Sequence, residues 1–145
     1  MDRHNLPDHV QMDFNDAFLG EEIGHGASRA VFEYRINPKF VVKVEYEDDW
    51  FQNVIEWETW NEIKFTKWAK WFAPCANISK NGRVLMQAKT TPVKKFPEQI
   101  PNFLTDLKAA NFGMYKGHIC AHDYGLNLLT SNGIGNARMK KAHWW

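Results

Sequence analysis

Three short strand-forming segments separated by turn residues constrain the fold most strongly. The first leads into the turn Gly24-His25-Gly26, the second is 30–34, and Asn37-Pro38 separates it from the third, 40–44. β-branched and aromatic residues favour strands, whereas Gly, Asn and Pro favour the turns between them. The region from Phe18 to Val44 therefore predicts a three-stranded antiparallel meander.

The third segment carries a single lysine among valines. Side chains alternate between the two faces of a strand, so Val41, Lys43 and Glu45 share one face. Two arrangements fit this pattern. Either the face is exposed to solvent, or Lys43 points into a polar cleft beneath the glycine turn, where its charge would meet an anion.

A long helix is predicted after the meander. Asp48 and Asp49 suit the positive end of a helix dipole, and the helix would run to about Lys70 with a break near 64–66. Further on, Asn81-Gly82 is typical of a tight turn, and 83–88 is predicted to be a strand with Ile78 on its partner. The first part of the chain is thus expected to run β-β-β-α-β-β.

The predicted helix is rich in tryptophan. Large aromatic rings usually fill a core, and a surface that stacks bases would normally carry more positive charge, so we expect these rings to be packed inside. The lysines of 64–71 are expected on a solvated face. The tryptophans are Trp50, Trp57, Trp60, Trp68 and Trp71.

The second half contains a polar stretch, Asp106–Gly125, in which Lys116-Gly117 predicts a hairpin with strands at 112–114 and 118–121. Asp106, Asn111 and Asp123 offer the hard oxygen atoms that Mg²⁺ prefers, and an aspartate can also accept a proton or orient a hydroxyl. Before this stretch, 89–101 has three prolines and three lysines and predicts a connector or one short helix. Residues 1–17 are expected to be irregular or a short helix, and 137–145 to form a last basic-aromatic turn.

Composition excludes several classes of protein. The chain has 145 residues and a net charge of +1, which favours one domain or two small lobes and argues against a nucleic-acid binder. Cys75 and Cys120 form neither a disulfide framework nor a metal motif and predict reduced thiols in the cytoplasm. Nothing resembles a signal peptide or a membrane helix.

Two other candidate sites are weaker. His118, Cys120 and His122 alternate along a predicted strand and could bind a metal, but we prefer the interpretation that both histidines are structural. Cys75 has no His or Asp in the sequence that would activate it as a nucleophile.

Three pieces then occur in one order: Gly24-x-Gly26-x-x-Arg29-x-Val31, a lysine in the next strand, and Asp106-Leu107-x-x-x-Asn111 with Asp123-Tyr124-Gly125. With an acid-bearing helix between the second and third, this order resembles the protein-kinase-like superfamily. The resemblance implies an α+β fold. A kinase-like N-lobe, with an antiparallel sheet of about five strands and one main helix, would precede a much reduced C-lobe with a catalytic-loop hairpin. The expected divisions of a single domain are an arm (1–17), a nucleotide-binding lobe (18–88), a hinge (89–101) and a reduced catalytic lobe (102–145).

The resemblance also implies ATP and Mg²⁺ as cofactors. Backbone amides around Gly24, Gly26 and Ser28 would cover the phosphates, Lys43 would contact the α- and β-phosphates, and Gln87 and Ala88 would lie near the adenine.

In the second half, the resemblance implies that Asn111 and Asp123 hold Mg²⁺, that Asp106 accepts or orients the substrate hydroxyl and that Lys108 steadies the γ-phosphate. Glu56, Glu58 and Glu62 compete as partners of Lys43. Glu56 is preferred because the apolar residues Trp60 and Ile63 follow on its helical stripe.

The chain departs from the kinase-like pattern in ways that bear on function. Arg29 stands at the third loop glycine, Leu104-Thr105 precede Asp106, and Tyr124 replaces the usual Phe. The helical bulk of a kinase-like large lobe is not expected in the residues after Gly125. Two hypotheses remain beside chance resemblance: a minimal phosphotransferase acting on a protein or small hydroxyl compound, and a pseudokinase-like module that docks on a partner protein without turnover. Trp144-Trp145 would suit an interface, a second copy could cover apolar surface, and the small size suggests a phage or prophage protein in the host cytoplasm.

Overall fold

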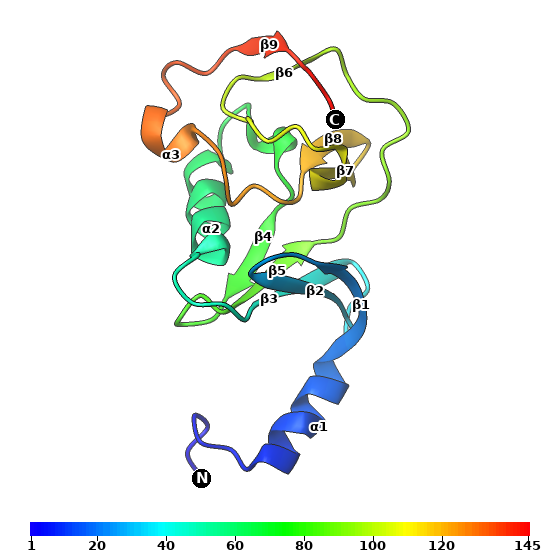
Figure 1. The fold of residues 1–145 in the computed structure, drawn as a ribbon, viewed down its shortest axis with the longest axis vertical. Helices are drawn as coiled ribbons and strands as arrows, with labels where there is room; N and C mark the ends of the chain where they lie inside the picture. The colour runs from blue at the N-terminus through cyan, green and yellow to red at the C-terminus, as the bar shows by residue number, and fades with distance from the viewer.

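A five-stranded antiparallel sheet forms the first half of the computed structural model, which describes residues 1–129 and 131–145 (Figure 1). Its strand order is β1-β2-β3-β5-β4. The strands are β1 (Leu19–His25), β2 (Arg29–Tyr34), β3 (Phe40–Glu45), β4 (Cys75–Ile78) and β5 (Val84–Ala88). The predicted meander and the predicted strand pair that follows the helix are therefore confirmed.

One main helix, α2 (Gln52–Ile63), lies between β3 and β4 in the chain and packs against the sheet. The predicted α+β class, with about five strands and one main helix, is confirmed. The buried positions of α2 recur every three or four residues, as expected for one helical face. Unusually, three of these four side chains are polar: Asn53, Glu56 and Thr59 precede Ile63.

The second half contains two small antiparallel pairs and no long helix among the described residues. The predicted hairpin is present as β7 (Phe112–Tyr115) and β8 (His118–Ala121), and β6 (Gln99–Pro101) pairs with β9 (Met139–Lys141). The remaining helical elements are α1 (Asp8–Phe18), α3 (Leu129–Asn132) and two 3₁₀ turns, Ala69–Trp71 and Ala109–Asn111. Figure 1 shows these small sheets on the opposite side of the main sheet from α1.

The hydrophobic core joins the two halves. Apolar side chains from α2 and the first 3₁₀ turn meet those that follow β6 and those at the end of the hairpin. Phe72 is central, because its ring stacks on Phe103 and meets the edge of Tyr124 at centroid distances of 5.6 and 4.9 Å. The second half is thus packed on α2 rather than hinged freely from the sheet.

Both the start and the end of the predicted long helix need correction. The helix does not begin at Asp48 or Asp49 but at Gln52, after Asp49 and Phe51 adopt left-handed backbone angles (φ 67° and 54°), and its first turn has no acid. The break near 64–66 is real, but the piece beyond it is only the 3₁₀ turn. The β3–α2 loop, not a dipole signal, sets where the helix starts.

The tryptophans divide between core and surface. Trp68 and Trp71 are buried, Trp57 and Trp60 are half-buried against the core, and Trp50 is exposed. The prediction that these rings are buried is therefore confirmed for Trp68 and Trp71 and wrong for Trp50.

The N-terminal helix α1 buries none of its residues and projects away from the sheet (Figure 1). Within the described part of the chain, no helix combines the length and apolar character needed to cross a bilayer.

Gly113 permits the closest approach between β7 and the segment after β5. A Cβ placed there would lie 2.2 Å from Thr90 Oγ1 and 3.0 Å from the Thr91 carbonyl oxygen. We expect Gly113→Ala to lower the free energy of unfolding by about 1–3 kcal/mol because one of the two segments must move. Chemical denaturation of Gly135→Ala is the matched control, since a Cβ at Gly135 meets nothing within 4 Å. Equal stabilities of the two variants would contradict this contact.

Candidate functional site

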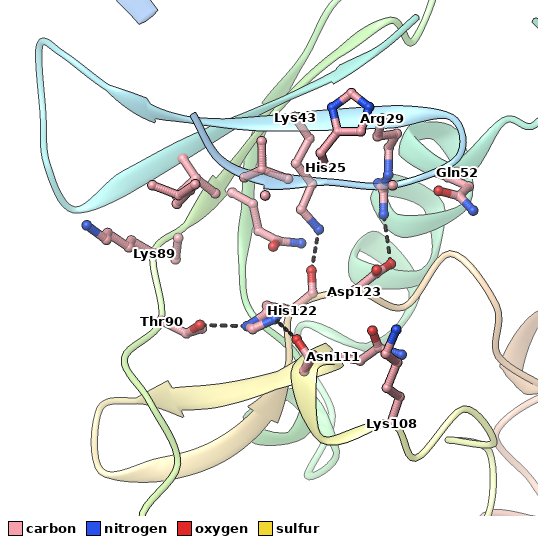
Figure 2. Close-up of a pocket in the computed structure, with 18 residues that line it drawn as sticks. His25, Arg29, Lys43, Gln52, Lys89, Thr90, Lys108, Asn111, His122 and Asp123 are labelled. Atoms are coloured by element: carbon pink, nitrogen blue, oxygen red, sulfur yellow. Dashed lines mark hydrogen bonds and ion pairs between the residues drawn. The ribbon is translucent and has the colours of Figure 1, made fainter. Parts of the chain in front are cut away.

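A cavity of about 460 Å³ lies between the glycine turn, the middle of β3, the end of β5 and the segment 108–123 (Figure 2). This volume is within the range of small-molecule sites, roughly 300–1,000 Å³. Its charged lining residues, among those that the structure describes, are four cations and one carboxylate. They are Arg29, Lys43, Lys89, Lys108 and Asp123.

Lys43 is buried and directed into this cavity, which decides between the two arrangements that its strand pattern left open. Its Nζ lies 2.7 Å from Glu56 Oε1 and also donates to the His122 carbonyl oxygen. Of the three competing glutamates, Glu56 is the one that pairs with Lys43, whereas Glu58 and Glu62 are exposed.

The carboxylate of Glu56 is fully buried behind the cavity and accepts hydrogen bonds from four residues. Besides Lys43, these are Arg29 Nη2 at 2.6 Å, Gln87 Nε2 at 3.2 Å and the Tyr124 backbone N–H at 3.2 Å. Although burial opposes the charged form, Lys43 and Arg29 together hold the pKa of Glu56 at about 2. Glu56 is therefore an ionised buried anion that both halves of the chain surround.

Arg29 is the site residue that sequence reasoning did not assign. Its guanidinium is almost fully buried and donates to Asn53 Oδ1 at 3.0 Å, to Glu56 Oε2 and, at 2.8 Å, to Asp123 Oδ1 (Figure 2). The sequence did carry a signal, because an arginine replaces a glycine in a glycine-rich turn.

The predicted catalytic segment reaches the cavity in part. Lys108, Asn111 and Asp123 line it, and the backbone N–H groups of His122 and Asp123 donate to the Asn111 carbonyl oxygen at 2.9 and 3.3 Å. Asp106 is not among the described lining residues; its carbonyl oxygen accepts from Asn111 Nδ2 at 3.4 Å. The structure therefore brings Asn111 and Asp123 together with Lys43 but leaves the Asp106 carboxylate outside.

His122 joins the segment after β5 to the hairpin. Its Nε2 lies 2.7 Å from the Ala110 carbonyl oxygen, which can only accept, so Nε2 carries the proton. Nδ1 then accepts from the Thr90 hydroxyl at 2.7 Å. Burial and the nearby Lys43 lower the pKa of His122, which keeps the ring neutral in this bridge. Nothing in the sequence marked this role, since Thr90 and His122 are distant in the chain.

The remaining predicted contacts are placed as follows. Gly24, Gly26, Gln87 and Ala88 line the cavity, whereas Ser28 is not among its described lining residues and donates through Oγ to Gln52 Oε1 at 3.1 Å. The Gln87 side chain turns inward to Glu56, and its Oε1 is buried with no hydrogen-bond partner among the described residues.

The cations that line the cavity beside Asp123 disfavour a magnesium ion at this position. Asp123 is the one carboxylate among the described lining residues, and Arg29 already binds its Oδ1. No group of three or more His, Cys, Asp or Glu side chains arranged for a metal occurs in the described part of the chain. A dication at the usual ~2 Å from this carboxylate would lie beside the guanidinium. Asn111 offers a further oxygen, but it is neutral, and one of the two carboxylate oxygens of Asp123 is already bound to Arg29.

The other candidates have structural roles. His118 packs against the Trp71 ring at 4.6 Å, Cys120 is fully buried, and burial raises the pKa of the Cys75 thiol to about 11. At that pKa the Cys75 thiolate is scarce at neutral pH, as expected for a cysteine that is not a nucleophile.

No protein-family model matches this chain, and no curated protein matches it. Among solved structures, it is similar to the protein in the streptomycin-ATP-APH(2")-IIa ternary complex, with 17% identity and a TM-score of 0.45. The similarity covers 63% of this chain and 31% of that protein, so the chain spans about a third of the other's length. This likeness says nothing of what the present chain binds.

Glu56 should dominate the stability of the site. We expect Glu56→Gln to lower the free energy of unfolding by about 3–5 kcal/mol, because it leaves Lys43 and Arg29 buried without their shared anion. Glu58→Gln, at an exposed position of the same helix, should change it by less than about 0.5 kcal/mol. Denaturant titrations of both variants provide the measurement, and similar losses in the two would contradict the central place of Glu56.

The lowered pKa of Glu56 also predicts how the free energy of unfolding changes at acidic pH. The folded pKa of Glu56, about 2, lies below its ordinary value of 4.5. Its stabilising contribution is therefore complete above pH 4.5 and is lost as the pH falls towards 2. The difference in unfolding free energy between wild type and Glu56→Gln should shrink across this window, while Glu58→Gln follows the wild-type profile. A difference independent of pH would show that Glu56 is not the titrating group.

Proposed function

We propose that the cavity binds ATP and that the chain acts as a kinase-like nucleotide-binding module. The observation that carries this is the buried Lys43–Glu56 pair, whose lysine faces a cavity lined by four cations and one carboxylate. A buried anion fixes the lysine in place, and fixed ammonium and guanidinium donors suit phosphate oxygens.

The upper wall of the cavity supports a nucleotide in particular. Ile23, Val31 and Val41 supply apolar surface for a base. Gly24 and Gly26 do not require glycine for the fold, because a Cβ at either would find its nearest neighbour at 3.5 and 3.9 Å. Their missing side chains instead leave the backbone open to the cavity, which suits phosphates.

Binding without turnover is the activity that the contacts favour. The Asp106 carboxylate is not among the described lining residues, and Asp123 is paired with Arg29. A general base must come within hydrogen-bond reach of its hydroxyl. We therefore favour a pseudokinase-like module that docks on a partner protein; the partner, a second copy, a phage origin and the host cytoplasm stay predictions.

Phosphoryl transfer is the second candidate, and a specific observation favours it. Lys108, Asn111 and Asp123 line the same cavity as Lys43. Phosphoryl transfer would need such polar side chains beside the phosphates and the hydroxyl group that accepts the phosphoryl group. In this alternative Asp106 would orient a hydroxyl of a protein or small-molecule substrate after a local rearrangement of the 106–111 segment.

Lys43 should decide nucleotide affinity. We expect Lys43→Met to weaken ATP binding by about 10–100-fold, the loss of one charge-assisted contact to phosphate. Isothermal titration calorimetry, with and without Mg²⁺, provides the measurement. Lys39→Met is the matched control, since this exposed lysine lies just before β3 and is expected to leave the affinity unchanged. Absence of ATP binding by the wild type in both buffers would overturn the proposed function.

Turnover is tested separately with γ-labelled ATP. We expect no label on the chain or released as phosphate above the level of Asp106→Ala, since the carboxylate lies outside the cavity. Label that appears with wild type and is lost in Asp106→Ala would instead establish the phosphotransferase alternative.

A further inference from the structure

We propose that Arg29 takes the place of a divalent metal ion in this cavity, so that the chain binds the nucleotide's phosphates without Mg²⁺. This inference rests on the proposed nucleotide binding, but it concerns how the charge of the phosphates is neutralised. It reverses the expectation of a magnesium cofactor that came from the sequence.

The first support is the way Arg29 is fixed. Three acceptors from α2 and from the segment after β8 hold its guanidinium: Asn53 at 3.0 Å, Glu56 at 2.6 Å and Asp123 at 2.8 Å. Only 5% of the residue is exposed, yet it lines the cavity. The guanidinium has five N–H donors, and two of them have no partner among the described residues. The cation is therefore built into the fold and still has donors to offer.

The second support is the charge of Asp123. Its side chain is half exposed at the cavity, and in the absence of a cation it would repel a phosphate. In a magnesium site the ion removes this repulsion by bridging carboxylate and phosphate. Here the guanidinium is bound to the carboxylate directly, so the same neutralisation is achieved by a side chain of the protein (Figure 2).

The third support is the cost of adding a metal ion. A dication on the half-exposed carboxylate of Asp123 would lie beside the Arg29 guanidinium, in a cavity that Lys43 also lines. Like charges repel, and the two positive side chains therefore oppose a second positive charge at this position. Displacing Arg29 would in turn remove a donor from the buried Glu56 carboxylate. The arrangement therefore favours the arginine over the metal.

The dependence of ATP affinity on Mg²⁺ tests this inference. Calorimetric titrations of the whole chain with ATP in EDTA and in Mg²⁺ should give a Kd in EDTA that is equal to that in Mg²⁺ within about threefold, or tighter. In Arg29→Gln, ATP in EDTA should bind about tenfold more weakly than to wild type, and Mg²⁺ should restore part of the affinity. Arg35→Gln, an exposed arginine of the same hairpin, is the control and should behave as wild type.

A second variant covers the case in which Arg29→Gln fails to fold. Asp123→Asn keeps the shape of the half-exposed side chain and removes its charge. We expect it to tighten ATP binding in EDTA by about fivefold, because the charge of Arg29 is then no longer offset by the Asp123 carboxylate. If Asp123 is a magnesium ligand instead, the same variant weakens ATP binding in Mg²⁺.

The outcomes distinguish a failure of the role proposed for Arg29 from a failure of nucleotide binding itself. Wild-type binding that is more than threefold tighter in Mg²⁺ than in EDTA, or Asp123→Asn that binds more weakly in Mg²⁺, would overturn the role of Arg29 while leaving nucleotide binding established. Absence of ATP binding in both buffers would overturn nucleotide binding and this inference together.

Discussion

The buried carboxylate of Glu56 is the interaction on which the rest of the structure depends. A charge with no exposure is tolerable only when donors surround it, since an unpaired buried ion costs several kcal/mol. The donors come from β2, β3, β5 and the segment after β8. The polar face of α2 follows from this requirement, because the helix buries an anion against the sheet rather than an apolar stripe.

The same anion connects the two halves of the chain. The backbone N–H of Tyr124 donates to Glu56, and the Tyr124 hydroxyl donates to the Ala73 carbonyl oxygen at 2.8 Å, so two hydrogen bonds anchor the Asp123-Tyr124-Gly125 turn. Trp145 holds the other side of the site, because its backbone bonds to Leu107 and Ala109. The second half, whose described residues form no long helix, is thus kept in place by polar anchors and by the aromatic core around Phe72.

The features that could be predicted from the sequence are those set by residues close together in the chain. The meander, the Asn81-Gly82 turn, the β7–β8 hairpin and the α+β class follow from alternation and turn residues, which need no distant partner. The start of α2 was predicted wrongly because the left-handed backbone of Asp49 and Phe51 depends on how the β3–α2 loop packs, which the local sequence does not show. The Trp50 ring was expected inside for a similar reason: helical spacing does not say which face has something to pack against.

The sequence by itself determined the order of the strands and helix, the clustering of polar residues near Asp106–Gly125 and the candidacy of Lys43. Only the tertiary structure decided that Glu56 pairs with Lys43, that His122 bridges to Thr90, and that Arg29 pairs with Asp123. The physical reason is distance along the chain. Arg29 and Asp123 are 94 residues apart, and a charge pair of that separation is set by how the two halves pack, not by any pattern that a local stretch can carry.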